Sequence, residues 1–272
     1  MTETHIPRKR FGQNFLKDNH VIDKIINALH PRSQDLLVEI GPGLGALTQV
    51  VLNQIDHLFV VEIDKDLSAK LQASYPPSRL SVIEEDALKY NFALLSQQSQ
   101  DPMKKMRIFG NLPYNISTPL LFHLLSFSPL IQDMLFMLQK EVVMRMAAKS
   151  NQDDYGRLSI MIQYFCEVHP LFDVGPQSFF PPPKVMSSIV RLKPYGENRP
   201  FKLARNEKLF SHIVAVAFQH RRKTLKNALG DLVPQEIFTN INLDPKRRPE
   251  TLSVEEYIAL SDAVDIYKNN SN

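Results

Sequence analysis

Four consecutive residues, Asn111-Leu112-Pro113-Tyr114, have the functional groups needed to hold an aromatic amine. The Asn111 side-chain oxygen and the Leu112 carbonyl are acceptors for its two N–H groups. Pro113 restricts the preceding residue to an extended conformation and so aims the Leu112 carbonyl. Tyr114 offers a flat ring for base stacking, worth about 1–3 kcal/mol in nucleic-acid sites. The set suits methyl transfer to an adenine amine, a poor nucleophile that gains from being held in line with a donor.

An Asn-x-Pro-aromatic sequence is short and arises by chance in many proteins. The alternative interpretation is an asparagine-capped turn that leads into a helix predicted over residues 118–126. The position of the tetrapeptide in the chain favours its interpretation as an amine-binding loop. The tetrapeptide follows a predicted strand, 108–110, and catalytic loops in open parallel sheets lie at the carboxyl ends of strands.

A glycine-rich turn, Gly41-Pro42-Gly43-Leu44-Gly45, joins the first predicted strand to a helix. Glycines let the backbone approach a ligand closely, and the helix N-terminus supplies unpaired N–H groups. Glu62 ends the next strand, where its carboxylate can accept hydrogen bonds from both hydroxyls of a ribose. This order favours a nucleotide-type ligand over a turn that only packs a helix on a strand. The glycine spacing fits both NAD and S-adenosylmethionine enzymes.

Asp86 closes the third predicted strand and allows two interpretations. Its carboxylate can accept a hydrogen bond from the exocyclic amine of a cofactor adenine. It can equally cap the N-terminus of a following helix, as an aspartate after a strand commonly does. Position alone does not separate the two.

The elements that must position these residues alternate between short apolar strands and amphipathic helices. This rhythm predicts an α/β fold, a parallel sheet with helices on both faces, and two later strands predict an antiparallel addition to it. After about Pro194 only helical periodicity remains, so we expect one domain over residues 1–194 and a small all-helical domain over residues 195–272. The expected strands are 36–40, 57–62, 80–84, 108–110, 133–138, 168–174 and 187–192, and the expected helices are 18–29, 46–53, 65–73, 118–126, 141–149, 158–164, 206–218, 222–229, 234–238 and 254–264.

The amino-acid composition of the chain limits which kind of protein it can be. The chain has 272 residues, of which 43% are hydrophobic and 22% charged, which permits a sizeable core and excludes wholesale disorder. Its one cysteine, Cys166, lies in an apolar run, so we expect a buried, inert thiol in a reducing, cytoplasmic setting. The eight histidines show no metal-ligand spacing, and we expect no metal. Residues 1–20 lack an apolar signal segment, so we expect a soluble protein.

Together, six motifs resemble those of the ribosomal RNA adenine dimethyltransferases, most closely the bacterial small-subunit branch known for kasugamycin resistance. The motifs are Gly12-Gln13-Asn14-Phe15-Leu16, the glycine turn, Val61-Glu62-Ile63-Asp64, Asp86-Ala87, Asn111-Leu112-Pro113-Tyr114-Asn115 and Phe179-Phe180-Pro181-Pro182-Pro183-Lys184-Val185. The resemblance implies a Rossmann-like S-adenosylmethionine-dependent methyltransferase fold with a helical C-terminal domain. It also implies four methyl transfers to the N6 atoms of two adjacent adenosines in the 3′-terminal hairpin of small-subunit (16S) rRNA, and a role in small-subunit biogenesis.

The same resemblance assigns roles to individual residues. It implies that Phe180 and Tyr114 sandwich the flipped adenine, although Phe179-Phe180-Pro181 taken alone is more often a buried turn. It implies an N-terminal segment that closes over the cofactor. The implied cofactor contacts are Asn14, Leu16, Gly41, Gly43, Gly45, Glu62, Asp86 and Asn111.

Basic residues gather in three short clusters. Residues 184–272 hold 15 Lys and Arg against 10 Asp and Glu, although the whole chain has a net charge of only +3. Each cluster alone is more often a solvated surface, but beside a base-methylating site they favour rRNA within an immature small subunit as the partner. The predicted RNA contacts are Arg8, Lys9 and Arg10 in the first cluster, Arg221, Arg222, Lys223 and Lys226 in the second, and Arg247 and Arg248 in the third.

Two rival functions share many of these features. A large-subunit rRNA adenine methylase of the macrolide-resistance type has the same fold and motifs, and a non-catalytic ribosome-assembly factor can retain the fold without the activity. The basic tail and the Asn-Leu-Pro-Tyr motif favour the small-subunit enzyme. We expect a monomer without a membrane partner.

Overall fold

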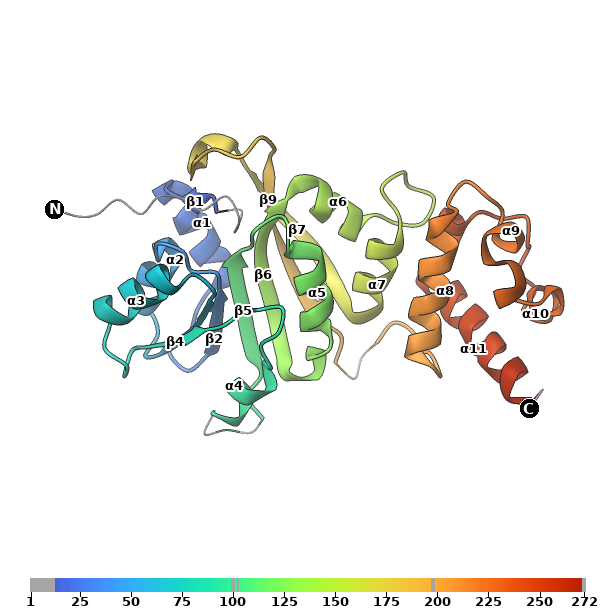
Figure 1. Cartoon of the computed structure of the whole chain (residues 1–272), viewed down its shortest axis with the longest axis horizontal. Coiled ribbons are helices and arrows are strands. Elements are labelled where there is room, and N and C mark those ends of the chain that lie inside the picture. The colour runs from blue at the N-terminus through green and yellow to red at the C-terminus, as the bar shows by residue number, and fades with distance from the viewer. Residues whose placement is uncertain (1–12, 99–100, 102, 197–198, 271–272) are drawn as a thin grey trace. The chain divides into compact units, whose positions relative to one another are not determined.

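The computed structural model describes residues 13–98, 101, 103–196 and 199–270, and Figure 1 labels its elements. The chain forms two compact units, Met1–Val143 with Val168–Pro194, and Met144–Glu167 with Tyr195–Asn272. The expected boundary at residue 194 is present, but a single cut there is wrong, because residues 144–167 belong with the C-terminal helices. The reason is aromatic packing, since the Tyr164 ring stacks on Phe210 with centroids 4.5 Å apart.

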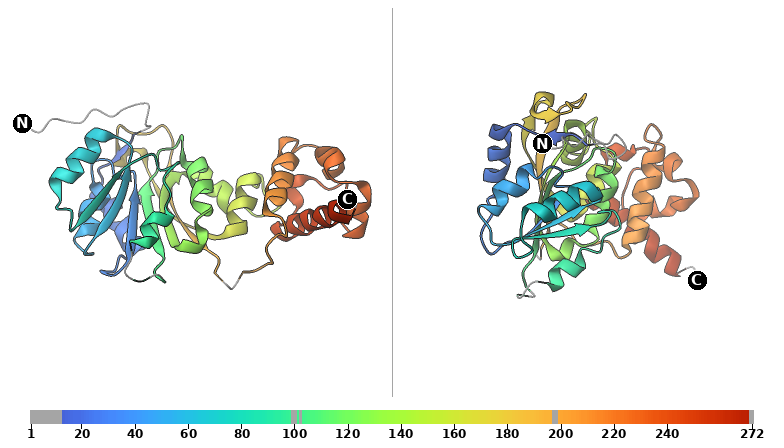
Figure 2. Two further views of the ribbon diagram at one scale, coloured as in Figure 1. Left: turned by 60° about the horizontal axis from the view of Figure 1, so that its bottom comes forward. Right: turned by 60° about the vertical axis from the view of Figure 1, so that its left-hand side comes forward.

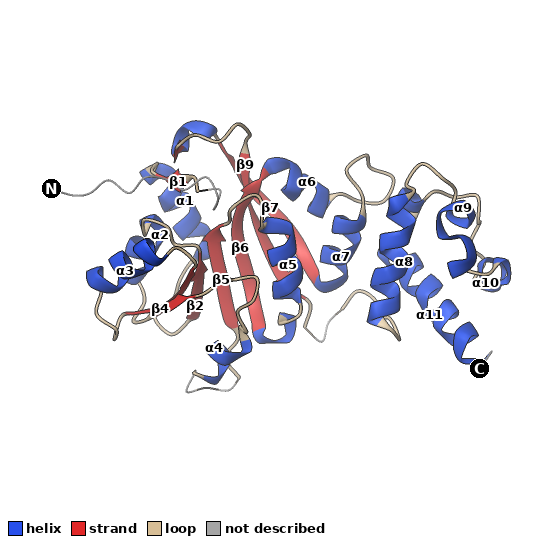
Figure 3. Ribbon diagram, in the orientation of Figure 1, coloured by secondary structure: helices blue, strands red, loops and turns tan. Residues whose placement is uncertain are grey.

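The first unit is built on a seven-stranded sheet in the order β4-β3-β2-β5-β6-β9-β7 (Figure 3). The strands from β4 to β6 are parallel, and β9 pairs antiparallel with β6, so the expected antiparallel addition is confirmed for β9. These strands are β2 (Leu36–Ile40), β3 (Leu58–Glu62), β4 (Leu80–Glu84), β5 (Met106–Asn111), β6 (Ile131–Gln139), β7 (Cys166–Val174) and β9 (Ser187–Pro194). The helices among them are α1 (Asn19–Leu29), α2 (Ala46–Leu52), α3 (Lys65–Ser74), α4 (Ala93–Gln97), α5 (Ser117–Leu125) and α6 (Lys140–Ala147).

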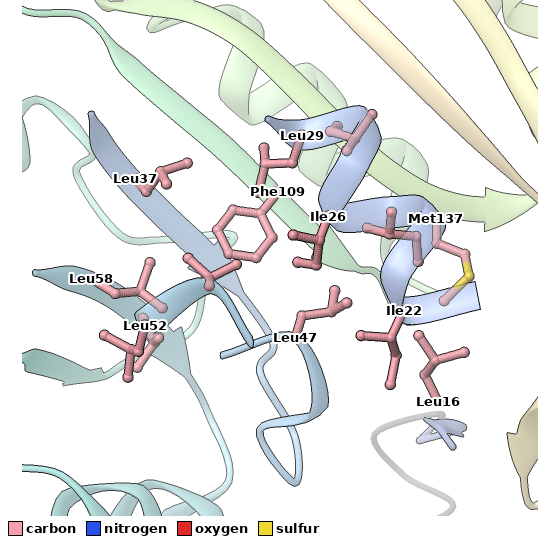
Figure 4. Close-up of a cluster of buried hydrophobic side chains, with 14 of the residues drawn as sticks. Leu16, Ile22, Ile26, Leu29, Leu37, Leu47, Leu52, Leu58, Phe109 and Met137 are labelled. Atoms are coloured by element: carbon pink, nitrogen blue, oxygen red, sulfur yellow. The ribbon is translucent and has the colours of Figure 1, made fainter. Parts of the chain in front are cut away.

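Every residue of β2 is buried, which requires cover on both faces of the sheet and explains why four of the five residues of that strand are apolar. Figure 4 shows the packing on one face, where Ile22 and Ile26 of α1 lie near Phe109 of β5 and Met137 of β6. Leu16 joins the same cluster and so anchors the N-terminal end of the described chain in the core.

Two very short strands were not expected from the sequence. β1 (Phe15–Leu16) pairs antiparallel with β8 (Phe179–Phe180), in a register that places Phe15 opposite Phe180 and Leu16 opposite Phe179. Strands of two residues leave no periodic signal, and their pairing joins segments more than 160 positions apart. The pairing brings Phe15 and Leu16 of one motif beside Phe179 and Phe180 of another.

Gly110 lets β5 pass close to the end of β2, which brings Asn111 toward the glycine turn. A Cβ at position 110 would lie 2.3 Å from the carbonyl oxygen of Ile40, a backbone atom that cannot move aside cheaply. We expect Gly110→Ala to lower the free energy of unfolding by about 1–3 kcal/mol, measured by urea denaturation. The control is Gly196→Ala, where nothing lies within 4 Å of the added Cβ. Equal stability of the two variants would contradict this prediction.

The second unit is helical apart from the first residues of β7, and its part from α8 onward, orange to red in Figure 2, contains only helices and loops. Tyr155 donates a buried hydrogen bond to the Leu252 carbonyl at 2.9 Å and ties the residue 144–167 segment to the C-terminal part. The helices are α7 (Arg157–Phe165), α8 (Glu207–Gln219), α9 (Leu225–Leu229), α10 (Gln235–Asn240) and α11 (Val254–Asn270). Cys166 is buried and unpaired, and burial raises the pKa of its thiol to about 12, in agreement with an inert group.

Candidate functional site

The predicted glycine turn is present and has the backbone geometry that glycine allows. Gly41, Gly43 and Gly45 have φ angles of 65°, 58° and 83°, and Gly45 occupies the N-cap position of α2. The ring of Phe15 packs closely on the turn, since a Cβ at Gly43 would lie 3.1 Å from it. The N-terminal segment, residues 13–16, therefore rests on the turn.

Glu62 links this turn to the end of β3. One carboxylate oxygen accepts the Gly43 N–H at 3.2 Å and the other accepts the Asp64 N–H at 2.9 Å. Burial raises the pKa of Glu62, and these two backbone N–H groups act in the opposite direction. A carboxylate held in this way presents fixed acceptor oxygens beside the turn.

Glu39 is a second buried carboxyl near the turn, and the sequence reasoning missed it. Its side chain lies in the middle of β2, is 2% exposed, and accepts a hydrogen bond from the Thr48 hydroxyl at 2.6 Å. Burial raises the pKa of Glu39 to about 8; the Thr48 bond lowers it and the nearby charge of Glu62 raises it. The available signal was a single acid within the apolar run of residues 36–40.

The shifted pKa of Glu39 predicts a pH-dependent stability. An unfolded chain releases the Glu39 proton near pH 4.5, whereas the folded chain keeps it until about pH 8. Between these values the folded state holds the extra proton, so this group makes the free energy of unfolding fall as pH rises, by up to about 1.4 kcal/mol per pH unit. We expect Glu39→Gln, which never ionises, to gain stability over the unsubstituted protein at pH 8 but not at pH 5. Urea denaturation at both pH values measures this, and identical pH profiles would contradict it.

Asp86 lies just beyond β4 and serves the local turn. One of its carboxylate oxygens accepts the Leu88 N–H at 3.0 Å and closes a turn. The helix-capping interpretation of Asp86 is wrong, because the next helix begins only at Ala93. The residue also borders the cavity described below, so the second interpretation, a contact to a cofactor adenine, stays a prediction.

The tetrapeptide begins on the last residue of β5. The Asn111 side-chain nitrogen donates to the Asn14 carbonyl at 2.9 Å, which fixes the amide plane. The side-chain oxygen is an acceptor that no hydrogen bond among the described residues occupies. The Leu112 N–H donates to the Met137 carbonyl at 3.2 Å, and the Leu112 side chain is buried. The helix-capping alternative for Asn111 is wrong, because α5 begins after Ile116 without a side-chain cap.

One cavity of about 330 Å³ joins these features. The predicted cofactor and catalytic residues that line it are Asn14, Leu16, Gly41, Gly43, Glu62, Asp86, Asn111, Leu112, Pro113 and Tyr114. Gly45 does not line the cavity, because it turns the chain into α2 and packs near Leu71. Apolar lining residues that the sequence reasoning missed include Leu44 and Ile63, which carried no polar group to attract attention.

The two neighbouring phenylalanines of β8 have opposite surroundings. Phe179 is 1% exposed and belongs to the core, whereas Phe180 is 59% exposed and does not line the cavity. Further hydrogen bonds hold this segment to the N-terminal one: the Lys17 N–H donates to the Ser178 carbonyl, and the Ser178 hydroxyl donates to Asp18, both at 2.9 Å. Phe180 is thus an exposed ring on a well-fixed backbone.

Two of the predicted basic clusters lie side by side in the second unit. The Leu225 N–H donates to the Arg247 carbonyl at 2.7 Å, and the Lys226 N–H donates to the Pro245 carbonyl at 3.1 Å. The helix expected over residues 222–229 begins only at Leu225, so Arg222 lies before the helix and does not share a helix face with Lys226. The reason is that the chain turns before Thr224, which occupies the N-cap position.

The side chains of these basic residues are not equally available. Arg247 forms an ion pair with Glu256 at 2.5 Å, and Arg221 donates to the Asp153 carbonyl at 2.5 Å, so both hold the unit together. The side chains that extend into solvent are Arg222, Lys223, Lys226 and Arg248. The first predicted cluster, Arg8, Lys9 and Arg10, lies outside the described residues.

The family model for ribosomal RNA adenine dimethylase matches residues 4–265. The chain belongs to this family. Among curated relatives, the ribosomal RNA small subunit methyltransferase A of Acinetobacter baylyi is 52% identical, with 96% of this chain and 93% of the relative covered. The protein of that name from Nitrosospira multiformis is 50% identical, with 94% and 96% covered. The family expected from the motifs is therefore confirmed.

Solved structures agree with this membership. The dimethyladenosine transferase of Plasmodium falciparum matches with a TM-score of 0.76 and 28% identity, covering 94% of this chain and 98% of that one. The 23S rRNA methyltransferase ErmE matches with a TM-score of 0.65 and 22% identity, covering 93% and 100%, and at that identity shows a shared fold. Within the described residues we find no group of three potential metal-ligating side chains and no helix long and apolar enough to cross a membrane.

Proposed function

We propose that this chain transfers methyl groups from S-adenosylmethionine to the N6 atoms of two adjacent adenosines in the 3′-terminal hairpin of small-subunit rRNA, four transfers in all. The observation that carries the proposal is the single cavity shared by the glycine turn, Glu62 and the Asn111–Tyr114 tetrapeptide. It would place a nucleotide-type cofactor and the acceptors for an amine in one space. The curated relatives are named for the small ribosomal subunit.

The residues of the cavity fit S-adenosylmethionine. Glu62 supplies fixed acceptors for ribose hydroxyls, the positive-φ glycines allow close approach of a ligand, and the apolar Leu44 and Ile63 offer surfaces for an adenine ring. Asp86 borders the same space, and the N-terminal segment contributes Asn14 and Leu16. When bound, this cofactor supplies an electrophilic methyl group on a sulfonium.

The chain's own contribution to the reaction is positioning. The free oxygen of Asn111 and the Leu112 carbonyl hold the two N–H groups of the target amine, and Tyr114 stacks on its base. Such orientation lowers the barrier because the nitrogen is already aligned with the methyl donor. The base must leave its stack to reach these groups. We assign the ring of Phe180, which is exposed, to the other face of the base.

For the partner, we propose rRNA in an immature small subunit, bound in the cytoplasm by a monomer. The exposed side chains of Arg222, Lys223, Lys226 and Arg248 come from two segments joined by backbone hydrogen bonds, and together they make a positive surface for phosphates. Arg8, Lys9 and Arg10 add positive charge in the sequence before the cofactor segment.

The proposal is tested by label transfer. Immature small subunits from cells that lack this activity are incubated with the protein and methyl-tritiated S-adenosylmethionine, and the modified nucleotides are mapped by primer extension. We expect label at two adjacent adenosines near the 3′ end, with large-subunit rRNA unlabelled. Label in large-subunit rRNA would favour the macrolide-resistance alternative, and absence of label from both would favour a non-catalytic factor.

A further inference from the structure

Hydrogen bonds hold both the ring and the backbone of Tyr114. Its phenolic oxygen lies 2.6 Å from the hydroxyl oxygen of Ser187, and its main-chain carbonyl accepts a hydrogen bond from the Ser117 hydroxyl at 3.1 Å. Ser187 is fully buried. Burial raises the pKa of Tyr114, while the bond to Ser187 acts against that rise, so the phenol keeps its proton at neutral pH. The contact is a hydrogen bond between two neutral hydroxyls.

The sheet register shows what this hydrogen bond spans. Asn111, three residues before Tyr114, pairs with Met137 of β6, and Gln139 at the end of β6 pairs with Ser187 of β9. The Tyr114 side chain therefore starts on the β5 side of β6 and ends at β9 on the other side. Only a hydroxyl at the far end of the ring reaches Ser187 from there, so phenylalanine would keep the stacking face but lose the anchor.

Ser187 also belongs to the segment that carries the second aromatic ring. Phe180 precedes it by seven positions and is the last residue of β8, and Ser187 is the first residue of β9. The Tyr114–Ser187 contact thus ties the loop after β5 to the start of the strand that follows the Phe180 segment. The Tyr114 ring is thus hydrogen-bonded to the residue that follows the connection from Phe180, the second ring assigned to the target base.

We propose that Ser187 is a positioning residue for methyl transfer, which holds the Tyr114 ring in the orientation that stacks on the target base. The inference rests on the proposed function, because it gives Ser187 a role through the base contact of Tyr114. Ser187 itself does not line the cavity, so its loss acts on the lining through the Tyr114 ring and leaves Glu62 and the glycine turn, which hold the cofactor in this proposal, in place. Loss of the Ser187 hydroxyl should weaken base stacking and slow turnover, and it should leave cofactor affinity unchanged.

The test compares Ser187→Ala, Tyr114→Phe and the double variant, with Ser188→Ala as the matched control. Ser188 is the next residue of β9, is also buried, and donates to the Phe172 carbonyl at 3.3 Å, so its loss removes a similar hydroxyl without touching Tyr114. Turnover is measured on immature small subunits. Stacking is measured by the fluorescence of 2-aminopurine, placed at a target position of a synthetic 3′-terminal hairpin, which stacking quenches. Cofactor affinity is measured by calorimetry.

We expect Ser187→Ala and Tyr114→Phe each to lower kcat by about three- to tenfold, the range of one neutral hydrogen bond. Both variants should show weaker quenching of 2-aminopurine and an unchanged cofactor Kd. The double variant should be no slower than either single variant, and Ser188→Ala should match the unsubstituted protein.

Three outcomes would overturn the inference. They are normal turnover and quenching in Ser187→Ala, additive losses in the double variant, or an equal loss in Ser188→Ala. Failure of the proposed function is distinguishable from these, because it would appear in the unsubstituted protein as an absence of transfer to small-subunit rRNA.

Discussion

Asn111→Ala should reduce methyl transfer by at least about a hundredfold, the usual cost of removing one preorganised polar group from a reacting centre. The substitution deletes the side-chain oxygen that we assign to the target amine and the nitrogen that donates to Asn14 at 2.9 Å. The fold should persist, because the lost hydrogen bond contributes about 1 kcal/mol and the side chain is only half-buried. Label transfer under single-turnover conditions gives the rate, and circular dichroism confirms the fold.

The matched control for this prediction is Asn53→Ala. Asn53 is an exposed residue at the C-terminus of α2, away from the cavity lining, and its removal should leave the rate unchanged. A folded Asn111→Ala protein with full activity would remove Asn111 from the mechanism. An unfolded variant would show instead that the Asn14 contact matters more for stability than we expect.

Glu62→Ala should raise the cofactor Kd by about ten- to a hundredfold. Hydrogen bonds to a charged group contribute about 1.5–3 kcal/mol, and this carboxylate both offers acceptors to a ribose and holds the Gly43 N–H. We assign Glu62 to the cofactor and not to the target amine. Turnover at saturating S-adenosylmethionine should therefore fall much less than the affinity for S-adenosylmethionine. Isothermal titration calorimetry measures the Kd.

Glu84→Ala is the matched control for Glu62→Ala. Glu84 pairs in register with Glu62 on the adjacent strand β4, is exposed, and lies 3.7 Å from Lys65 in a surface ion pair. The substitution Glu84→Ala removes one negative charge, as Glu62→Ala does, but on the adjacent strand, and it should leave cofactor affinity unchanged. Equal affinities of the Glu62→Ala and unsubstituted proteins would show that Glu62 serves only to shape the turn.

The periodicity of the sequence was sufficient for most of the sheet. The strands β2 and β4 begin and end where predicted, because each is a short apolar run bounded by polar or glycine residues. What periodicity does not encode is which helices share a core. The α7 segment was assigned to the first domain from its place in the chain, whereas the stacking of Tyr164 on Phe210 places it in the second unit.

The site was predictable where a residue's chemistry and its place at a strand end agreed. Glu62 and Asn111 follow this rule, and both border the cavity. The rule does not find Ser187 or Glu39. Ser187 begins β9, and its partner Tyr114 is 73 positions away. Glu39 lies within β2, and its partner Thr48 is on the following helix. Gly45 was predicted to contact the cofactor because of its place in the glycine motif. It is needed for the turn but does not line the cavity.

The antiparallel contact of Phe15 with Phe180 has a consequence for repeated catalysis. Phe15 packs on the glycine turn that borders the cofactor cavity, while its backbone partner carries the ring that we assign to the RNA base. A product cofactor that leaves past Phe15 would move the backbone that pairs with Phe180, the residue assigned to the base. If the product cofactor leaves by that route, we expect cofactor exchange and binding of the target base to be coupled through the Phe15–Phe180 pairing.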